Sequence, residues 1–275
     1  MNPVRRRTLV LFLAGCCLFC RSLGLASNVE VRYKEGLTHG FLVLSTLDGT
    51  PIAAGDLSEI VRGNQVTSRL TFHFKDGSLQ DETTVFSQRK TFSLVSYHLI
   101  QKGPAFKHPT EVTVSPSTGQ VTVRYTDDKG KDQVTDEHMK LPSDLANGLV
   151  LTLLKNIRPG ETIPELSMVV ATPKPRVVKL KVAFDGKEPF ALAGSNREAL
   201  HYVIKIEIGG VEGWLAPWLG KQPPDSHVWV MGGDAPTFAK SETLSYFGGP
   251  MWRTELTSPV WPRAAEEPKS AQPGQ

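Results

Sequence analysis

Cysteine is scarce in this chain of 275 residues, which contains three cysteines, all within Cys16–Cys20. Removal of the first 26 residues would leave a chain without a thiol. Such a chain can form no disulfide, no thiolate nucleophile and no cysteine-ligated metal site. Its stability must therefore come from a hydrophobic core.

Long apolar runs are also missing. The run Leu9–Cys20 is shorter than the roughly 20 residues that a membrane-spanning helix needs, and Arg21 follows it. No transmembrane span is therefore expected in the mature chain. Because Arg5–Arg7 precede the run and the small-residue site Gly24–Ala26 follows it, residues 1–26 are predicted to be a signal peptide.

Two processing routes are compatible with this signal. Cleavage after Ala26 would release a soluble periplasmic or secreted protein. Alternatively, Leu13–Cys16 has the form of a lipoprotein box, in which Cys16 would be lipidated. Both routes predict an exported protein of the periplasm or cell envelope, and the second adds a lipid anchor.

A basic excess is missing once the signal is set aside. Residues 1–26 carry four arginines and no acidic residue, so the net charge of +3 becomes about −1 for the remainder. Nucleic-acid binding needs clustered Lys and Arg side chains, and none is expected here.

Motifs for metal, phosphate or dinucleotide binding are absent, and no cofactor, metal site or catalytic residue is predicted. The nearest approach to a hydrolytic site is the acidic group Asp76, Asp81 and Glu82 beside His73. Since Asp76-Gly77 has the sequence of a turn, Asp81 and Glu82 are expected on solvent-exposed backbone just after it. A second candidate for a hydrolytic site is the combination of Asp225 with His227.

Strand signals dominate what is present. Apolar residues recur at every second position, as in Leu70–Phe74 and Val121–Tyr125. Turn sequences such as Asp48-Gly49, Asp76-Gly77 and Asp185-Gly186 separate these runs and predict hairpins. Half-solvated strands joined in this way indicate a mainly β fold, with a strongly curved antiparallel sheet or an open barrel.

One helix is predicted near 143–156. Ser143 follows Pro142 as its expected N-cap, and Arg158–Gly160 should end it. This helix would join two β blocks of a single domain. The predicted units are residues 27–140 and 161–262 for the blocks, 27–262 for the domain and 263–275 for a disordered tail rich in Pro, Glu, Lys and Gln.

All five tryptophans lie in the last quarter of the chain. The segment Gly213–Gly220 is too apolar for a solvated hairpin tip, so it must be covered by the fold or must cover something else. The aromatic residues either build the core of the second block or form a surface for a ligand or partner. The candidate binding residues are Trp214, Trp218, Trp229 and Trp252.

Several short segments carry a resemblance. They are Gly40–Leu44, Phe74–Ser78, Gln101–Pro104, Gly220–Asp225 and Gly249–Arg253. In these segments the chain resembles an uncharacterised family of exported bacterial β-rich proteins with no established activity. The resemblance implies export and a β architecture.

Three functional hypotheses follow. The first is a non-catalytic exported protein whose sheet presents an apolar face to a lipid-like ligand or an envelope partner. The second is an envelope hydrolase that uses the acidic residues named above. The third is an interaction module that docks through the Trp-rich C-terminal region.

Overall fold

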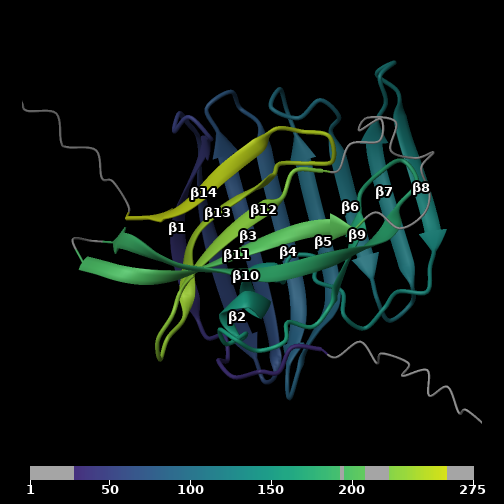
Figure 1. Cartoon of the computed structure of the whole chain (residues 1–275). Coiled ribbons are helices and arrows are strands. Elements are labelled where there is room, and N and C mark those ends of the chain that lie inside the picture. The colour runs from purple at the N-terminus through teal and green to yellow at the C-terminus, as the bar shows by residue number, and fades with distance from the viewer. Residues whose placement is uncertain (1–27, 193–194, 208–222, 259–275) are drawn as a thin grey trace, which may run out of the picture.

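The computed structural model describes residues 28–192, 195–207 and 223–258, which form fourteen strands and one short helix (Figure 1). The elements are β1 (Thr38–Thr46), β2 (Pro51–Arg62), β3 (Gln65–Phe74), β4 (Leu79–Gln88), β5 (Phe92–Lys102), β6 (Thr110–Ser115), β7 (Gln120–Thr126), β8 (Asp132–His138), α1 (Val150–Lys155), β9 (Leu166–Val170), β10 (Arg176–Leu192), β11 (Ser195–Glu207), β12 (Ser226–Met231), β13 (Thr237–Leu244) and β14 (Met251–Thr257). The predicted signal peptide, Cys16 and the predicted tail lie outside these residues.

All fourteen strands belong to one antiparallel sheet, in the order β8-β7-β6-β5-β4-β3-β2-β1-β14-β13-β12-β11-β10-β9. Neighbours in the sheet are also consecutive in the chain except at one place, where β1 pairs with β14 in the register Leu42 to Leu256. The prediction of a mainly β, antiparallel fold is confirmed. The β1–β14 pairing divides the sheet into halves of eight and six strands.

The two halves face each other as layers. In Figure 1, β9–β14 lie in front of β1–β8 and cross them at an angle, with α1 near the lower end. One core cluster contains Phe86 and Val114 from the first half together with Leu180 and Tyr202 from the second, and Leu154 of α1 is part of it. The apolar faces of the halves are therefore buried against each other and against the helix.

The prediction of a strongly curved sheet or an open barrel is wrong, because the sheet is neither closed nor strongly curled. Closure would require β8 to pair with β9, but the chain between them occupies the edge of β9. Leu145 forms a parallel bridge with Ser167, and the Asn147 side chain binds both backbone groups of Val169. Each half instead buries its apolar face by packing against the other half.

The predicted helix over 143–156 is also wrong in extent, since α1 covers only Val150–Lys155. The backbone of Asp144 and Ala146 is hydrogen-bonded to Ser167 of β9, so these residues extend the sheet instead. Gly148 follows with φ of 67°, which breaks any helical run before α1. Strand pairing thus replaces the first turns of the expected helix.

Of the three turn sequences named above, two are confirmed as turns. Asp48-Gly49 joins β1 to β2 and Asp76-Gly77 joins β3 to β4, with positive φ at both glycines. Asp185-Gly186 instead lies within the 17-residue strand β10, where the pairing with β11 shifts register between Phe184 and Gly186. The Asp-Gly pair lies at a β-bulge here, because β10 continues its pairing with β11 on both sides of it.

Candidate functional site: a cavity between the layers

A cavity of about 390 Å³ lies between the two layers, with α1 on one side. Strands β1–β5 and β9–β14 all contribute to its wall. Most of the lining side chains are apolar, among them Leu42, Leu57, Leu70, Phe72, Leu99, Leu151, Leu180, Ile204, Val228, Phe238 and Trp252. Its volume is within the range of roughly 300–1,000 Å³ that is common for small-molecule sites.

The alternation of the strands determines which side chains reach the cavity. On β2 the odd-numbered residues face inward, and on β3 and β4 the even-numbered ones do. Gly55 is one of the inward positions, and a Cβ there would overlap the ring of Phe72. Glycine at this position therefore lets the large ring of Phe72 lie flat against β2.

A row of polar side chains crosses this wall. Cross-strand pairing places Glu59 beside Ser68, Ser68 beside Thr84, and Thr84 beside Tyr97, and all four residues line the cavity. We call this row the polar stripe. The next row toward the cavity centre pairs Leu57, Leu70, Glu82 and Leu99 in the same way, and it is apolar except for Glu82.

Glu82 projects its carboxylate into this apolar wall. Tyr97 donates its hydroxyl to Glu82 Oε2 at 3.2 Å. Burial raises the pKa of Glu82 to about 6, and the hydrogen bond from Tyr97 only partly opposes that shift. Burial and the neighbouring carboxylate likewise raise the pKa of Tyr97 well above its ordinary value. The side chain of Glu82 is only half-buried because it borders the cavity.

Glu59 is the second acid of the cavity and is 4% exposed. Burial, followed by the negative charge of Glu35, raises the pKa of Glu59 to about 7, while Lys155 opposes the shift. Lys155 of α1 is itself bound to Glu35, with 2.5 Å between Nζ and Oε1. The positive charge of Lys155 is therefore shared between two carboxylates.

The predicted acidic group beside His73 does not converge. Asp81 and Glu82 are consecutive on a strand, so they face opposite sides of the sheet. Asp81 forms a bidentate pair with Arg69, and Asp76 accepts a hydrogen bond from the backbone of Ser78 in the turn. Asp81 lies on the outer face of β4, where its side chain is 18% exposed beside Arg69, whereas the even-numbered position of Glu82 turns its side chain inward.

The two described tryptophans of the predicted binding set lie in different places. Trp252 of β14 lines the cavity and packs in a cluster with Phe74 and Phe106. Trp229 of β12 belongs to a separate buried cluster, where its ring stacks on His201 with centroids 4.4 Å apart. Trp214 and Trp218 lie outside the described residues.

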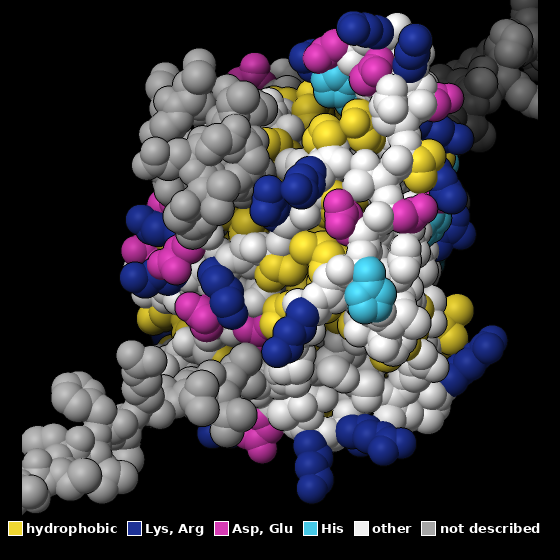
Figure 2. All heavy atoms as spheres, turned by 90° about the vertical axis from the view of Figure 1, so that its right-hand side faces the viewer, with side chains coloured by type: hydrophobic (Ala, Val, Ile, Leu, Met, Phe, Trp, Pro, Cys, Tyr) yellow, Lys and Arg dark blue, Asp and Glu magenta, His cyan; other side chains and the backbone are white. Residues whose placement is uncertain are grey.

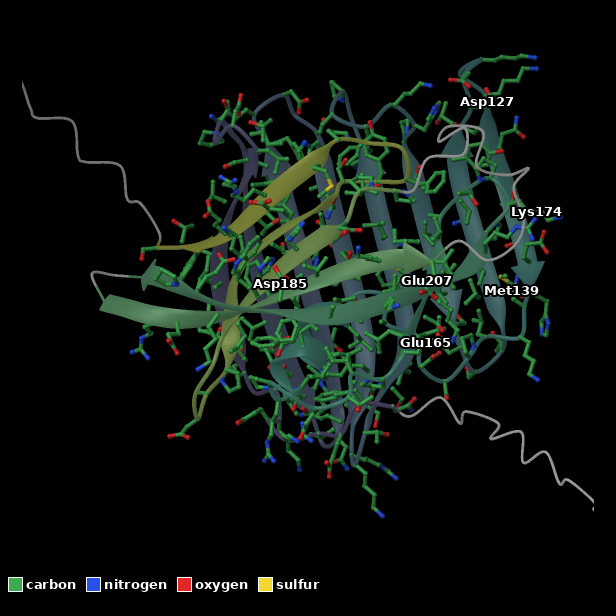
Figure 3. All side chains as sticks on the ribbon, in the orientation of Figure 1. Asp127, Met139, Glu165, Lys174, Asp185 and Glu207 are labelled. Carbon is green, nitrogen blue, oxygen red and sulfur yellow. The ribbon has the colours of Figure 1, made fainter. Side chains whose placement is uncertain are left out.

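Polar side chains surround the Trp229 cluster and contact its rings. Trp229 Nε1 donates to Glu188 Oε2 at 2.8 Å, and Lys240 Nζ lies 3.8 Å from the ring centroid of Trp229. His201 is bound on one side to His227, at 2.9 Å, and on the other to Glu188 and to Asp185, which Figure 3 labels on β10. With these contacts Trp229 is only 6% exposed.

The combination of Asp225 with His227 does not form a site either. Asp225 pairs with Lys205 at 3.2 Å, whereas His227 is bound to His201. In the described parts of the chain, no group of three or more His, Cys, Asp and Glu residues is placed to hold a metal ion. No helix within the same residues is long and apolar enough to cross a membrane.

The outer surface offers a less enclosed binding site than the interior. A second hollow of about 460 Å³ opens on the surface between Pro159, Lys187, Arg197, Glu198, Leu200, Gly232 and Gly233. Three of these residues, Lys187, Arg197 and Glu198, are charged, and the hollow is more open to solvent than the cavity between the layers. Figure 2 shows hydrophobic side chains scattered among Lys, Arg, Asp and Glu on one described face, without a continuous apolar patch.

Comparisons of the chain with known protein families, with curated protein sequences and with solved structures find no match. The cavity and its residues therefore carry the functional argument by themselves.

Proposed function

We propose that this protein is a non-catalytic binding protein for an apolar, lipid-like ligand, which occupies the cavity between the two layers. The observation that carries the proposal is the cavity itself, about 390 Å³ in volume, in whose lining apolar side chains, above all leucines, slightly outnumber polar ones. Apolar surface left facing an internal hollow costs free energy, and an apolar ligand would remove that cost.

The arrangement of the acids supports binding over hydrolysis. A hydrolytic pair needs two carboxyl groups that face one another across a substrate. Asp81 faces away from the cavity, and Glu59 and Glu82 project from the same wall, on β2 and β4, so they do not face one another across the cavity. The side-chain partners of His227 and Asp225 lie outside the cavity.

The proposal is tested with the neutral fluorophore N-phenyl-1-naphthylamine, which brightens in apolar surroundings. We expect saturable binding to the protein and its loss in Leu151→Trp, because the larger ring fills the cavity from α1. The matched control is Ile60→Trp, at a position that is 52% exposed on the outer face of β2. Equal binding by both variants, or none by the unmodified protein, would refute the proposal.

A further inference from the structure

We propose that the cavity is selective for an amphiphile with a cationic headgroup, such as a primary alkylamine, whose ammonium group is held by Glu82 and the polar stripe. This inference rests on the proposed function and specifies the ligand class for the same site.

The charges around the cavity are unbalanced. Among the described lining residues, Lys155 is the single base, whereas Glu59 and Glu82 are both acids. Lys155 is already paired with Glu35, a third carboxylate. Among the described residues, the one side-chain hydrogen bond to the Glu82 carboxylate comes from the neutral hydroxyl of Tyr97. A positively charged ligand would balance the negative charge of the carboxylates for which the cavity lining supplies no free base.

The hydrogen-bonding groups match an ammonium in number and kind. An ammonium group has three donors and no acceptor. Glu82 offers carboxylate oxygens, and the hydroxyl oxygens of Ser68 and Thr84 lie in the adjacent row of the same wall. The alkyl chain would then extend over the leucines that flank Glu82 in its own row, Leu70 and Leu99.

Anionic amphiphiles should be disfavoured by the same groups. A carboxylate or phosphate headgroup would add another negative charge beside Glu82 and Glu59 in surroundings of low dielectric. A neutral alcohol would lose only the charge interaction. The expected order of affinity is therefore amine, then alcohol, then fatty acid.

The experiment measures displacement of N-phenyl-1-naphthylamine at pH 8 by dodecylamine, dodecanol and dodecanoate, each below its critical micelle concentration. Dodecylamine should displace the probe at a concentration about tenfold lower than dodecanol, as expected for a charge-assisted hydrogen bond, and dodecanoate should be the weakest. In Glu82→Gln the advantage of the amine over the alcohol should disappear, while dodecanol displaces as before.

The matched control is Asp81→Asn, which removes one negative charge from the next residue on the outer face of the same strand. It should leave the preference for the amine unchanged. If all three compounds bind equally, or if Glu82→Gln keeps the preference, the headgroup inference is overturned and the proposed function stands. If none of the three displaces the probe, the proposed function fails with it.

Discussion

Tyr97 and Glu82 lie on neighbouring strands and are joined by a 3.2 Å hydrogen bond at the wall of the cavity, where Glu82 stands in a row of leucines. A carboxyl group in such a place is costly when it is ionised, and its pKa of about 6 expresses that cost. Proteins can retain such carboxyl groups because they bind a ligand. The contact between Tyr97 and Glu82 can be tested through protein stability and through the pKa of Glu82.

Stability should fall as pH rises because of Glu82. Its pKa is raised from 4.5 to about 6, so below pH 4.5 the carboxyl is neutral in both the folded and the unfolded chain. As pH rises through 6 the folded state must ionise a buried group, which costs about 2 kcal/mol. Relative to the unmodified protein, Glu82→Gln should gain that amount in urea unfolding between pH 4 and pH 8.

Asp81→Asn should change stability with the opposite sign, in a more acidic window below about pH 4. The pKa of Asp81 is lowered, first of all by its hydrogen bonds to Arg69. Its contribution to stability is present above its ordinary pKa of 3.8 and is lost as pH falls through the lower folded value. A Glu82→Gln variant that becomes relatively less stable between pH 4 and pH 8 would contradict the placement of Glu82.

Tyr97→Phe should raise the pKa of Glu82 above 6. The hydroxyl of Tyr97 stabilises the ionised carboxylate, and its removal leaves burial as the dominant cause. The measurement is a carbon-13 NMR titration of the Glu82 carboxyl. Tyr125→Phe on β7, outside the lining of the cavity, should leave the titration unchanged. An unchanged or lower pKa in Tyr97→Phe would show that the hydrogen bond is absent in solution.

Asn147→Ala should destabilise the edge of the sheet. The Asn147 side chain donates to the carbonyl of Val169 at 2.9 Å and accepts from its N–H at 2.8 Å, so the substitution leaves two buried backbone groups without a partner. The expected cost is about 2–4 kcal/mol in the free energy of unfolding. Hydrogen exchange should locate it, with loss of protection at the Val169 amide. Retained protection would contradict the pairing.

His201 should make the second layer sensitive to acid. Burial lowers its pKa, and the charges of His227 and Lys240 act in the same direction, while Glu188 and Asp185 oppose them. Stability from neutral His201 is present above its ordinary pKa of 6.5 and is lost as pH falls through the folded value. His201→Gln should flatten that loss in thermal unfolding between pH 7 and pH 5; an unchanged slope would refute it.

Much of the fold could be predicted from the sequence, because the two-residue alternation of strands such as β3 and β7 is a local pattern. The pairing of β1 with β14 could not, since it joins residues more than 200 positions apart, as in Leu42 with Leu256. That pairing decides whether the sheet curls or divides into two layers. The length of α1 was missed for a similar reason, because β9 competes for the backbone of residues 144–146.

The candidate site was predicted only in part. Trp252 lines the cavity as a predicted binding residue, but Glu59 was missed and Glu82 was placed in solvent. The strand phase could have revealed Glu59, which stands between Leu57 and Val61 at the inward positions of β2. It could not have revealed Glu82, because most of the inward positions of β4 are polar and form no apolar row.

The most direct test of the account is to locate a bound chain within the protein by NMR. With dodecanol added to protein labelled at its methyl groups, we predict nuclear Overhauser contacts from the alkyl chain to Leu42, Leu70 and Leu151, which line the cavity. Contacts confined to exposed Ile60, or none at all, would contradict the claim that an apolar ligand binds between the two layers.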